Sequence, residues 1–179
     1  MLSLRVFKLI FLLLIIGCST SKDDNCPTYA LTNSYSNKEL DFSIDLPGDY
    51  IVDKSSDVLA LSSVKPASDK NYIESCGVRV HQNNLNFKLE EFYQLALLAD
   101  EKDYGEIHDN YQVHKKGDRI INSNDSRWAI YSYDDEKVLS YFFVYRQNMY
   151  RVMFLSKKEH FDSLECKYKQ IINSIDFLQ

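Results

Sequence analysis

The first seventeen residues constrain this chain more than any other stretch. Two basic residues, Arg5 and Lys8, precede an unbroken apolar run, Leu9–Ile16, which ends at the small residue Gly17. A basic start, a short apolar core and a small residue at the cleavage point are typical of a secretory signal peptide. A transmembrane anchor is the alternative, but a spanning helix needs about 20 apolar residues, and this run is shorter. The sequence therefore predicts a signal peptide at residues 1–17 and a mature chain outside the cytoplasm.

The signal ends on a cysteine. Ile15-Ile16-Gly17-Cys18 resembles the bacterial lipobox, in which the bond after the small residue is cleaved and the cysteine becomes the acylated first residue. The resemblance implies cleavage between Gly17 and Cys18, a palmitate-type lipid on Cys18, and the lipid bilayer as a partner. Because two or more acyl chains hold a protein stably on a membrane, such a lipoprotein stays anchored.

Residues 19–38 are polar and show little apolar periodicity, so they are predicted to form a flexible tether after the lipidated Cys18. Within this segment, Lys22, Asp23 and Asp24 resemble the short Lys-Asp/Glu-Asp/Glu signal that directs lipoproteins of Bacteroidetes to the outer face of the outer membrane. A plain solvated linker is the alternative. The resemblance implies an outer-membrane location with exposure at the cell surface.

Charge argues against nucleic acid as a partner. The leader holds two of the 21 basic residues, so the mature chain carries 19 basic and 26 acidic residues, a formal charge of −7. An acidic surface repels a phosphate backbone. It also gives no help in holding anionic lipid, so the acyl chains must supply the anchoring.

Three cysteines remain once Cys18 carries lipid, and outside the cytoplasm two of them are expected to pair. Cys76 is in phase with Val78 in a strand-like run, which favours a buried free thiol. Cys26 lies in the tether, and Cys166 falls on the polar side of the last helix. The sequence therefore favours a Cys26–Cys166 disulfide, and no cysteine and histidine spacing suggests a zinc site.

Two kinds of apolar pattern alternate along the rest of the chain. Alternating apolar and polar residues indicate a strand with one buried face, and apolar residues 3.6 apart indicate an amphipathic helix. Strands are predicted at residues 40–46, 50–52, 58–61, 72–80, 111–122, 127–133, 138–145 and 149–155, and helices at 86–103 and from 156 onward. This order predicts one α+β domain at residues 39–179, with an antiparallel sheet sandwiched by two helices.

Some local features of these elements are also predicted. Residues 116–118, Lys-Gly-Asp, suggest a hairpin turn inside the strand pattern 111–122. Ser156 and Glu159 have the spacing of a capping box at the start of the last helix. The first helix is expected to be well covered, because three leucines widen its apolar stripe: Leu95, Leu97 and Leu98.

Four short motifs in this order resemble the PsbP-like fold, which is shared with a family of Ran-binding nuclear import factors. They are an opening Phe-x-Ile-x-x-Pro segment, a Leu-Glu-Glu-Phe helix, paired strands rich in Tyr and Phe, and a C-terminal Ile-x-x-Ser-Ile ending. Here they fall at Phe42–Pro47, Leu89–Phe92, Tyr141–Tyr150 and Ile172–Ile175. The resemblance implies a binding or structural module, because no shared catalytic residue exists to carry over and fold alone does not give function.

Reactive side chains form no recognisable cluster in the sequence. His108, Asp109, His114 and Asp118 come nearest to a metal site, but their spacing matches no ligand motif, so solvated polar residues are expected. Cys76 and His81 are five residues apart, which places them on opposite faces of a strand and disfavours a catalytic dyad. No Gly-x-Ser-x-Gly elbow and no glycine-rich phosphate loop occurs. The sequence predicts no enzyme, no metal and no cofactor.

Aromatic residues remain as the candidate contact surface. Tyr131, Tyr133, Tyr141 and Tyr145 are candidates for a groove that binds sugar or peptide, since a tyrosine offers a stacking face and a polar tip. The alternative is that these rings pack under helices or on a sheet. The predicted function is a membrane-anchored envelope lipoprotein that binds or assembles with another envelope protein or an extracellular ligand. A hydrolase with an aromatic-lined cleft and a surface adhesin are the alternatives.

Overall fold

The computed structural model describes residues 26–53, 61–65, 74–108 and 110–178, so the leader and the lipidation site lie outside the described residues. Ten strands and two helices occur in this part of the chain. In order they are β1 (Leu31–Asn37), β2 (Phe42–Pro47), β3 (Ile51–Asp53), β4 (Leu61–Lys65), β5 (Glu74–Gln82), α2 (Leu89–Ile107), β6 (Gln112–Ile121), β7 (Asn124–Tyr133), β8 (Glu136–Tyr145), β9 (Asn148–Lys157), α3 (Lys158–Asn173) and β10 (Asp176–Phe177).

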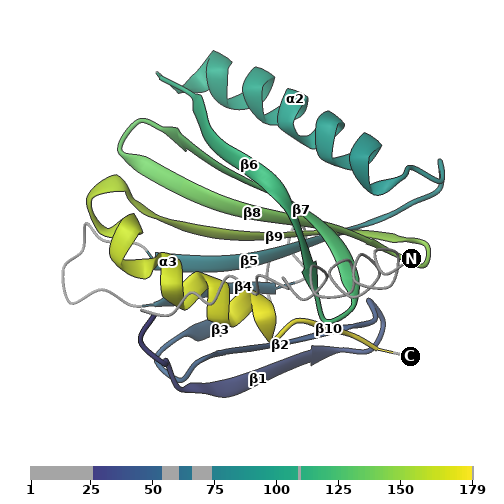
Figure 1. The fold of residues 1–179 in the computed structure, drawn as a ribbon, viewed down its shortest axis with the longest axis vertical. Helices are drawn as coiled ribbons and strands as arrows, with labels where there is room; N and C mark the ends of the chain where they lie inside the picture. Colours follow the sequence, from purple (N-terminus) through teal and green to yellow (C-terminus); the bar gives the residue numbers. More distant parts are fainter. Residues whose placement is uncertain (1–25, 54–60, 66–73, 109, 179) are drawn as a thin grey trace, which may run out of the picture.

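A seven-stranded antiparallel sheet forms the middle layer (Figure 1). Its strand order is β3-β4-β5-β9-β8-β7-β6, and tight turns join β6 to β7, β7 to β8 and β8 to β9. A second sheet has the order β1-β2-β10 and lies on the same side as α3 (Figure 1). The α+β architecture with a helix on each side of an antiparallel sheet is the one that the sequence predicts.

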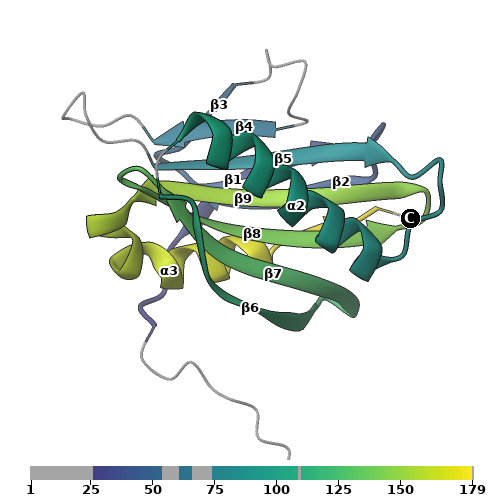
Figure 2. The ribbon, with the colours of Figure 1, turned by 90° about the horizontal axis from the view of Figure 1, so that it is seen from above.

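Helix α2 covers one face of the large sheet and crosses its strands diagonally (Figure 2). Burial of aromatic rings against α2 drives this contact, since each large ring removes a large apolar area from water. Phe92 and Tyr93 pack edge-on against Phe142, with ring centroids 5.7 and 5.3 Å away. The buried residues of this cluster are Phe92, Tyr93, Ala129, Tyr131, Tyr133, Val138 and Phe142.

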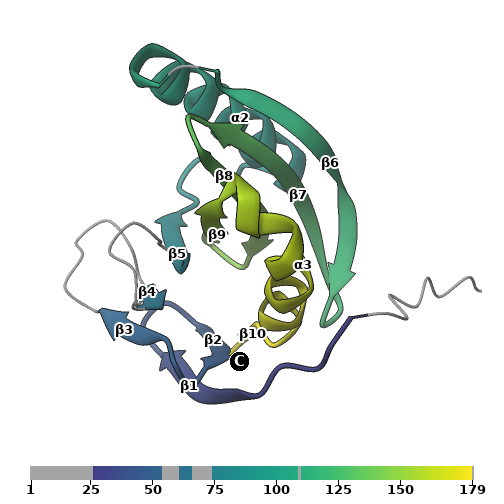
Figure 3. The same ribbon diagram turned by 90° about the vertical axis from the view of Figure 1, so that its left-hand side faces the viewer.

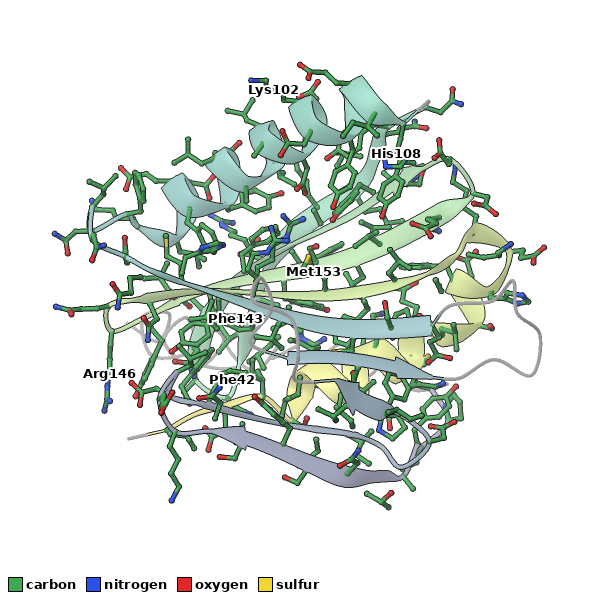
Figure 4. All side chains as sticks on the ribbon, turned by 180° about the vertical axis from the view of Figure 1, so that it is seen from behind. Phe42, Lys102, His108, Phe143, Arg146 and Met153 are labelled. Carbon is green, nitrogen blue, oxygen red and sulfur yellow. A yellow bond between two sulfur atoms is a disulfide. The ribbon has the colours of Figure 1, made fainter. Side chains whose placement is uncertain are left out.

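The opposite face of the sheet holds the larger core. Here the large sheet curves around α3, and the small sheet closes the other side (Figure 3). Figure 4 shows Phe143 on this side of the sheet and Met153 on the α2 side. The buried apolar residues of α3 face this core: Phe161, Tyr168, Ile171 and Ile172, followed by Ile175.

The chain before β1, Cys26–Ala30, forms an N-terminal strap that runs to α3. Cys26 and Cys166 form a disulfide with a Cα–Cα distance of 5.4 Å, the pair that the sequence favours. The backbone N–H of Tyr29 donates to Oε1 of Gln170 at 2.8 Å. Nζ of Lys167 lies 5.5 Å from the centroid of the Tyr29 ring. The strap is thus held to α3 by covalent, polar and cation–π contacts.

The predicted tether is wrong for residues 31–37, which form β1. This strand pairs along β2, for example Tyr35 with Ile44 and Asn37 with Phe42. Its alternation escapes notice in the sequence because the inward positions are partly polar: Leu31, Asn33, Tyr35 and Asn37 are less exposed than the residues between them. Tyr35 packs on Phe42 at 5.7 Å, so tertiary burial stabilises a strand that its own sequence barely indicates.

The predicted hairpin at residues 116–118 is also wrong. β6 runs straight through Gly117, and its turn lies at Asn122 and Ser123, which both have positive φ, at 47° and 66°. Two central residues of positive φ match the twist of an antiparallel hairpin. Ser123 is not a residue that marks this turn in the sequence, whereas the glycine at position 117 wrongly suggested a turn.

Both helices differ from prediction at their ends. Asn86 has a φ of 53°, so α2 begins later than residue 86, at Leu89. It continues through Gly105 to Ile107, because Tyr104 still packs on the sheet, against Tyr133 at 4.7 Å. The expected capping box is absent, since Ser156 belongs to β9 and pairs with Lys137.

The outer side of α2 is more open than predicted. Leu95 and Leu98 are 49% and 61% exposed, so the widened stripe of leucines is not fully covered. None of the helices in the described ranges is long and apolar enough to cross a membrane.

Candidate functional site

The strongest candidate for a contact site is a groove between the β6–β7 hairpin and α3, called the Trp128 groove below. It has a volume of about 290 Å³. Its buried floor and walls are Ile130, Leu139 and Tyr141, beside the partly buried Trp128, and its rim is charged: Asp118, Arg119, Glu165 and Lys169. Apolar and charged residues thus line the groove in equal number, and an apolar centre with a charged rim suits a contact with another chain.

The position of Trp128 depends on its neighbour across the sheet. Trp128 on β7 is directly opposite Gly117 on β6. A Cβ atom at Gly117 would lie 3.0 Å from three atoms of the indole. The missing side chain therefore lets the indole lie flat against β6 and form a wall of the groove. This is the structural reason for glycine inside a strand, where it otherwise weakens the sheet.

A larger hollow, about 470 Å³, lies on the α2 side of β6. Its charged side chains already pair with one another. Arg127 lies 2.8 Å from Glu90 and 3.6 Å from Asp118. Because Arg127 is held by these two carboxylates, this hollow offers a partner less than the Trp128 groove does.

The four tyrosines of the predicted groove do not come together. Tyr131 and Tyr133 belong to the cluster under α2, whereas Tyr141 and Tyr145 lie on the α3 face. Adjacent strands keep opposite residues on one face, and Tyr141 is paired with Trp128, not with a tyrosine. The packing alternative is correct: Tyr131, Tyr133 and Tyr141 are buried, and of the four only Tyr141 lines the Trp128 groove. The adhesin alternative loses the exposed tyrosine surface on which it depends.

Under α2 lies a buried polar network that the sequence did not predict. Both terminal nitrogens of Arg151 donate to the carboxylate of Asp100, with Nη1 2.8 Å from Oδ1. Nη2 of Arg151 also lies 2.7 Å from Oη of Tyr131. Burial raises the pKa of Tyr131 above its usual value, so its hydroxyl stays protonated.

A second buried network joins α3, β5 and the residue just before β3. Nζ of Lys167 lies 2.7 Å from Oε1 of Glu74, and the Tyr50 hydroxyl donates to the same oxygen. All three residues are buried. The pKa of Tyr50 is raised, first by burial and then by the charge of Glu74. A buried charge is tolerated only when it is paired and hydrogen-bonded, so this network stabilises the junction of three elements.

The histidines and the free cysteine lie apart from one another. Nδ1 of His108 lies 2.7 Å from Oδ2 of Asp134, and Nε2 of His114 lies 2.7 Å from Oγ of Ser132. They do not share a site, and among the described residues no three His, Cys, Asp or Glu side chains gather as metal ligands. Cys76 is buried and free, and burial raises the pKa of its thiol. The lipidation and export residues Gly17, Cys18, Lys22, Asp23 and Asp24 lie outside the described residues.

No protein-family model matches the chain, and no curated protein matches it in sequence. Solved structures do match it. The cyanobacterial PsbP protein of Synechocystis sp. PCC 6803 superposes with a TM-score of 0.65 at 11% identity, over 85% of this chain and 96% of that one. The chain has a PsbP-like fold.

Two other structures with this fold widen the comparison. The Ran-binding protein Mog1p of Saccharomyces cerevisiae matches with a TM-score of 0.58 at 8% identity, over 84% of this chain and 97% of that one. LpqN of Mycobacterium tuberculosis, described as involved in cell envelope biogenesis, matches with a TM-score of 0.59 at 11% identity, over 77% and 83%. At these identities the PsbP-like fold is shared, and function is argued from the site.

Proposed function

We propose that this PsbP-like protein is an outer-membrane lipoprotein, anchored by acyl chains on Cys18 and displayed at the cell surface. Its domain binds an extended segment of another envelope protein at the Trp128 groove and carries out no reaction. The leader pattern supports the anchoring, as argued from the sequence. The envelope role described for LpqN supports the location.

The environment of the ionisable groups supports a binding module. Asp100 and Arg151 satisfy each other, as do Glu74 and Lys167. The Cys76 thiol is buried and protonated, because burial raises its pKa. A nucleophile needs an adjacent base and access to substrate, and these groups are engaged in holding the fold together.

The single observation that carries the contact site is the Trp128 groove beside a free sheet edge. β6 is the last strand of the large sheet and has no strand partner on its outer side within the described ranges. An edge strand presents unpaired N–H and C=O groups, and an added strand uses them for affinity while side-chain pockets give specificity. The volume of about 290 Å³ suits one or two side chains rather than a whole ligand.

The charges on this face of β6 indicate the chemistry of the partner. Lys115 and Arg119 lie two residues to either side of Gly117, on the face that carries Trp128. Because side chains on one face recur every second residue, a strand added to β6 places one side chain over the indole and its next neighbours beside the two cations. The favoured partner segment therefore has the sequence pattern acidic–x–apolar–x–acidic, in which x is any residue.

The strap also bears on how far the domain extends from the membrane. Cys18 and Cys26 are eight positions apart, and an extended chain spans at most about 3.6 Å per residue. With Cys26 fixed to α3 by the disulfide, this point on α3 stays within about 30 Å of the lipid anchor. Under this proposal the partner is therefore a protein at the same membrane.

Fluorescence tests the contact directly, because Trp128 is the only tryptophan of the chain. The full chain is titrated with a synthetic peptide that contains Glu-Val-Phe-Val-Glu, and with a peptide in which lysine replaces both glutamates. We expect a saturable change in emission with the first peptide and at least about tenfold weaker binding of the second.

Two neighbouring lysines provide a matched pair of variants. Lys115 and Lys116 are both exposed, but Lys115 is on the face of Trp128 and Lys116 on the face of α2. Lys115→Glu is expected to weaken binding of the acidic peptide about tenfold, whereas Lys116→Glu should leave that binding nearly unchanged. No saturable change in the unmodified protein, or equal effects of the two variants, contradicts the proposed contact.

A further inference from the structure

Two arginines lie side by side on the α2 face of the large sheet, away from the Trp128 groove. Arg79 on β5 is directly opposite Arg151 on β9 in the antiparallel pairing. Side chains at such positions have Cβ atoms about 4.5–5.5 Å apart, and like charges there destabilise the sheet. A sheet that keeps both arginines therefore favours negative charge beside each of them.

Only one of the two arginines receives that charge from the described residues. Asp100 pairs with Arg151, and both side chains are 7% exposed. Within the described part of the chain, no hydrogen bond or ion pair joins Arg79 to another residue. The Nε atoms of Arg79 and Arg151 are both buried without a partner. A buried donor without a partner is uncommon in native proteins and indicates a bound water or ion.

Arg79 lies at a partly open place on this face of the sheet. The side chain is partly exposed, so a solute can reach it. Two residues before it on the same face is Gly77, which has no side chain, and two residues after it is the exposed His81. The pKa of His81 is lowered, first by partial burial and then by the positive charges of Arg79 and Arg151. The local potential at this face is thus positive.

We propose that Arg79, with Arg151 behind it, binds an oxyanion, the carboxylate or phosphate group of a ligand. A guanidinium presents Nε–H and Nη–H as a planar fork that matches two oxygens of such a group. The anion supplies the charge that Asp100 supplies to Arg151, and it removes the repulsion between the paired arginines. The site is on the opposite sheet face from the Trp128 groove, so it is independent of the proposed function.

Nuclear magnetic resonance of the arginine Nε–H groups tests this site. The full chain, labelled with ¹⁵N, is titrated with sodium sulfate and separately with sodium acetate, with sodium chloride holding the ionic strength constant. The Arg79 Nε–H signal is expected to shift saturably with at least one of them. Saturation by sulfate alone identifies a phosphate-like group, saturation by acetate alone identifies a carboxylate, and both results support the proposal.

Variants of Arg79 and of a control arginine complete the test. Arg79→Gln should abolish the saturable effect as read from the Arg151 Nε–H signal, and Arg79→Lys, which keeps the charge but loses the fork, should weaken it at least tenfold. Arg146→Gln is the control, since Arg146 points away at the end of β8 (Figure 4) and is 50% exposed beside Asp41. It should bind as the unmodified protein does.

His81 gives a second readout that a structural role of Arg79 would not move. A bound anion opposes the effect of the two arginines, so saturating sulfate should raise the pKa of His81, and sulfate keeps its charge through that titration. If neither anion shifts the Arg79 signal saturably, the proposal is overturned. It is equally overturned if folded Arg79→Gln binds the anion as tightly as the unmodified protein.

Discussion

Arg151 on β9 donates both of its terminal nitrogens to the carboxylate of Asp100 on α2, and the two residues are 6% and 5% exposed. This pair fixes the middle of α2 above the sheet. The apolar contacts of the helix lie toward both ends, at Phe92 and Tyr93 and at Tyr104, whereas Leu98 faces solvent. The charged pair adds a buried polar contact between these two ends.

Removing one partner of this pair should be far costlier than removing an exposed charge. Asp100→Ala leaves the Arg151 guanidinium buried without its carboxylate, and we expect a loss of about 3–5 kcal/mol in the free energy of unfolding. Glu101→Ala, an exposed neighbour on α2, should change it by less than about 0.5 kcal/mol. Urea denaturation measures both. Equal effects of the two variants would show that the pair does not hold α2.

Gly117 in β6 and Gly105 in α2 should respond to alanine in opposite directions. Gly117→Ala places a methyl group 3.0 Å from the Trp128 indole, so we expect a loss of about 1–3 kcal/mol from overpacking and a shift of the Trp128 emission. Nothing lies within 4 Å of a Cβ at Gly105, in α2, so Gly105→Ala should raise the free energy of unfolding by about 0.5–1 kcal/mol. A Gly117→Ala protein with unchanged emission and stability would contradict the packing of Trp128 on β6.

The hairpins β7–β8 and β8–β9 and the inner face of α3 could be predicted because their patterns are local. Tyr168 and Ile172 recur at helical spacing, and residues 134–135 and 146–147 break runs of strand-forming residues. β1 could not be predicted, since its pairing with β2 and the packing of Tyr35 on Phe42 are tertiary. Gly117 misled the prediction because a glycine that admits a neighbouring ring resembles a glycine in a turn.

The candidate site was less predictable than the fold. The predicted tyrosine groove failed because strand pairing, which the sequence does not give, decides which tyrosines share a face. One signal was available for the arginines: Arg79 and Arg151 each interrupt an apolar strand, between Val78 and Val80 and between Tyr150 and Val152. A charged residue within such a run indicates a polar feature on the other face. Trp128 gave no signal beyond being the only tryptophan.

The disulfide should contribute strongly to stability because it closes a long loop. Cys26 and Cys166 are 140 positions apart, and cross-links of this kind stabilise by about 2–5 kcal/mol. Cys26→Ser with Cys166→Ser should lower the urea midpoint of unfolding and make it insensitive to reductant. Cys76→Ala, which leaves the disulfide intact, should keep that sensitivity. A midpoint that reductant does not change in the unmodified protein would refute the bond.

Acid should weaken the fold through two histidines. The pKa values of His81 and His114 are both lowered from 6.5, first by burial and then by nearby cations. Between the lowered pKa of the folded protein and 6.5, the unfolded chain therefore binds more protons than the folded protein. The stability that the neutral histidines contribute is complete above pH 6.5 and is lost as the pH falls below it. The double variant His81→Gln, His114→Gln should show a flatter dependence of unfolding free energy on pH. An unchanged slope would contradict the lowered pKa values.

The β6 face that carries Trp128 is proposed to contact another envelope protein. The most direct test of this contact places a photo-crosslinking amino acid at position 115 or at position 116 in the living cell and examines cross-linked membrane proteins after illumination. We expect one discrete adduct from position 115, lost in the Arg119→Glu background, and none from position 116. Equal adducts from both positions, or none from position 115, would contradict it.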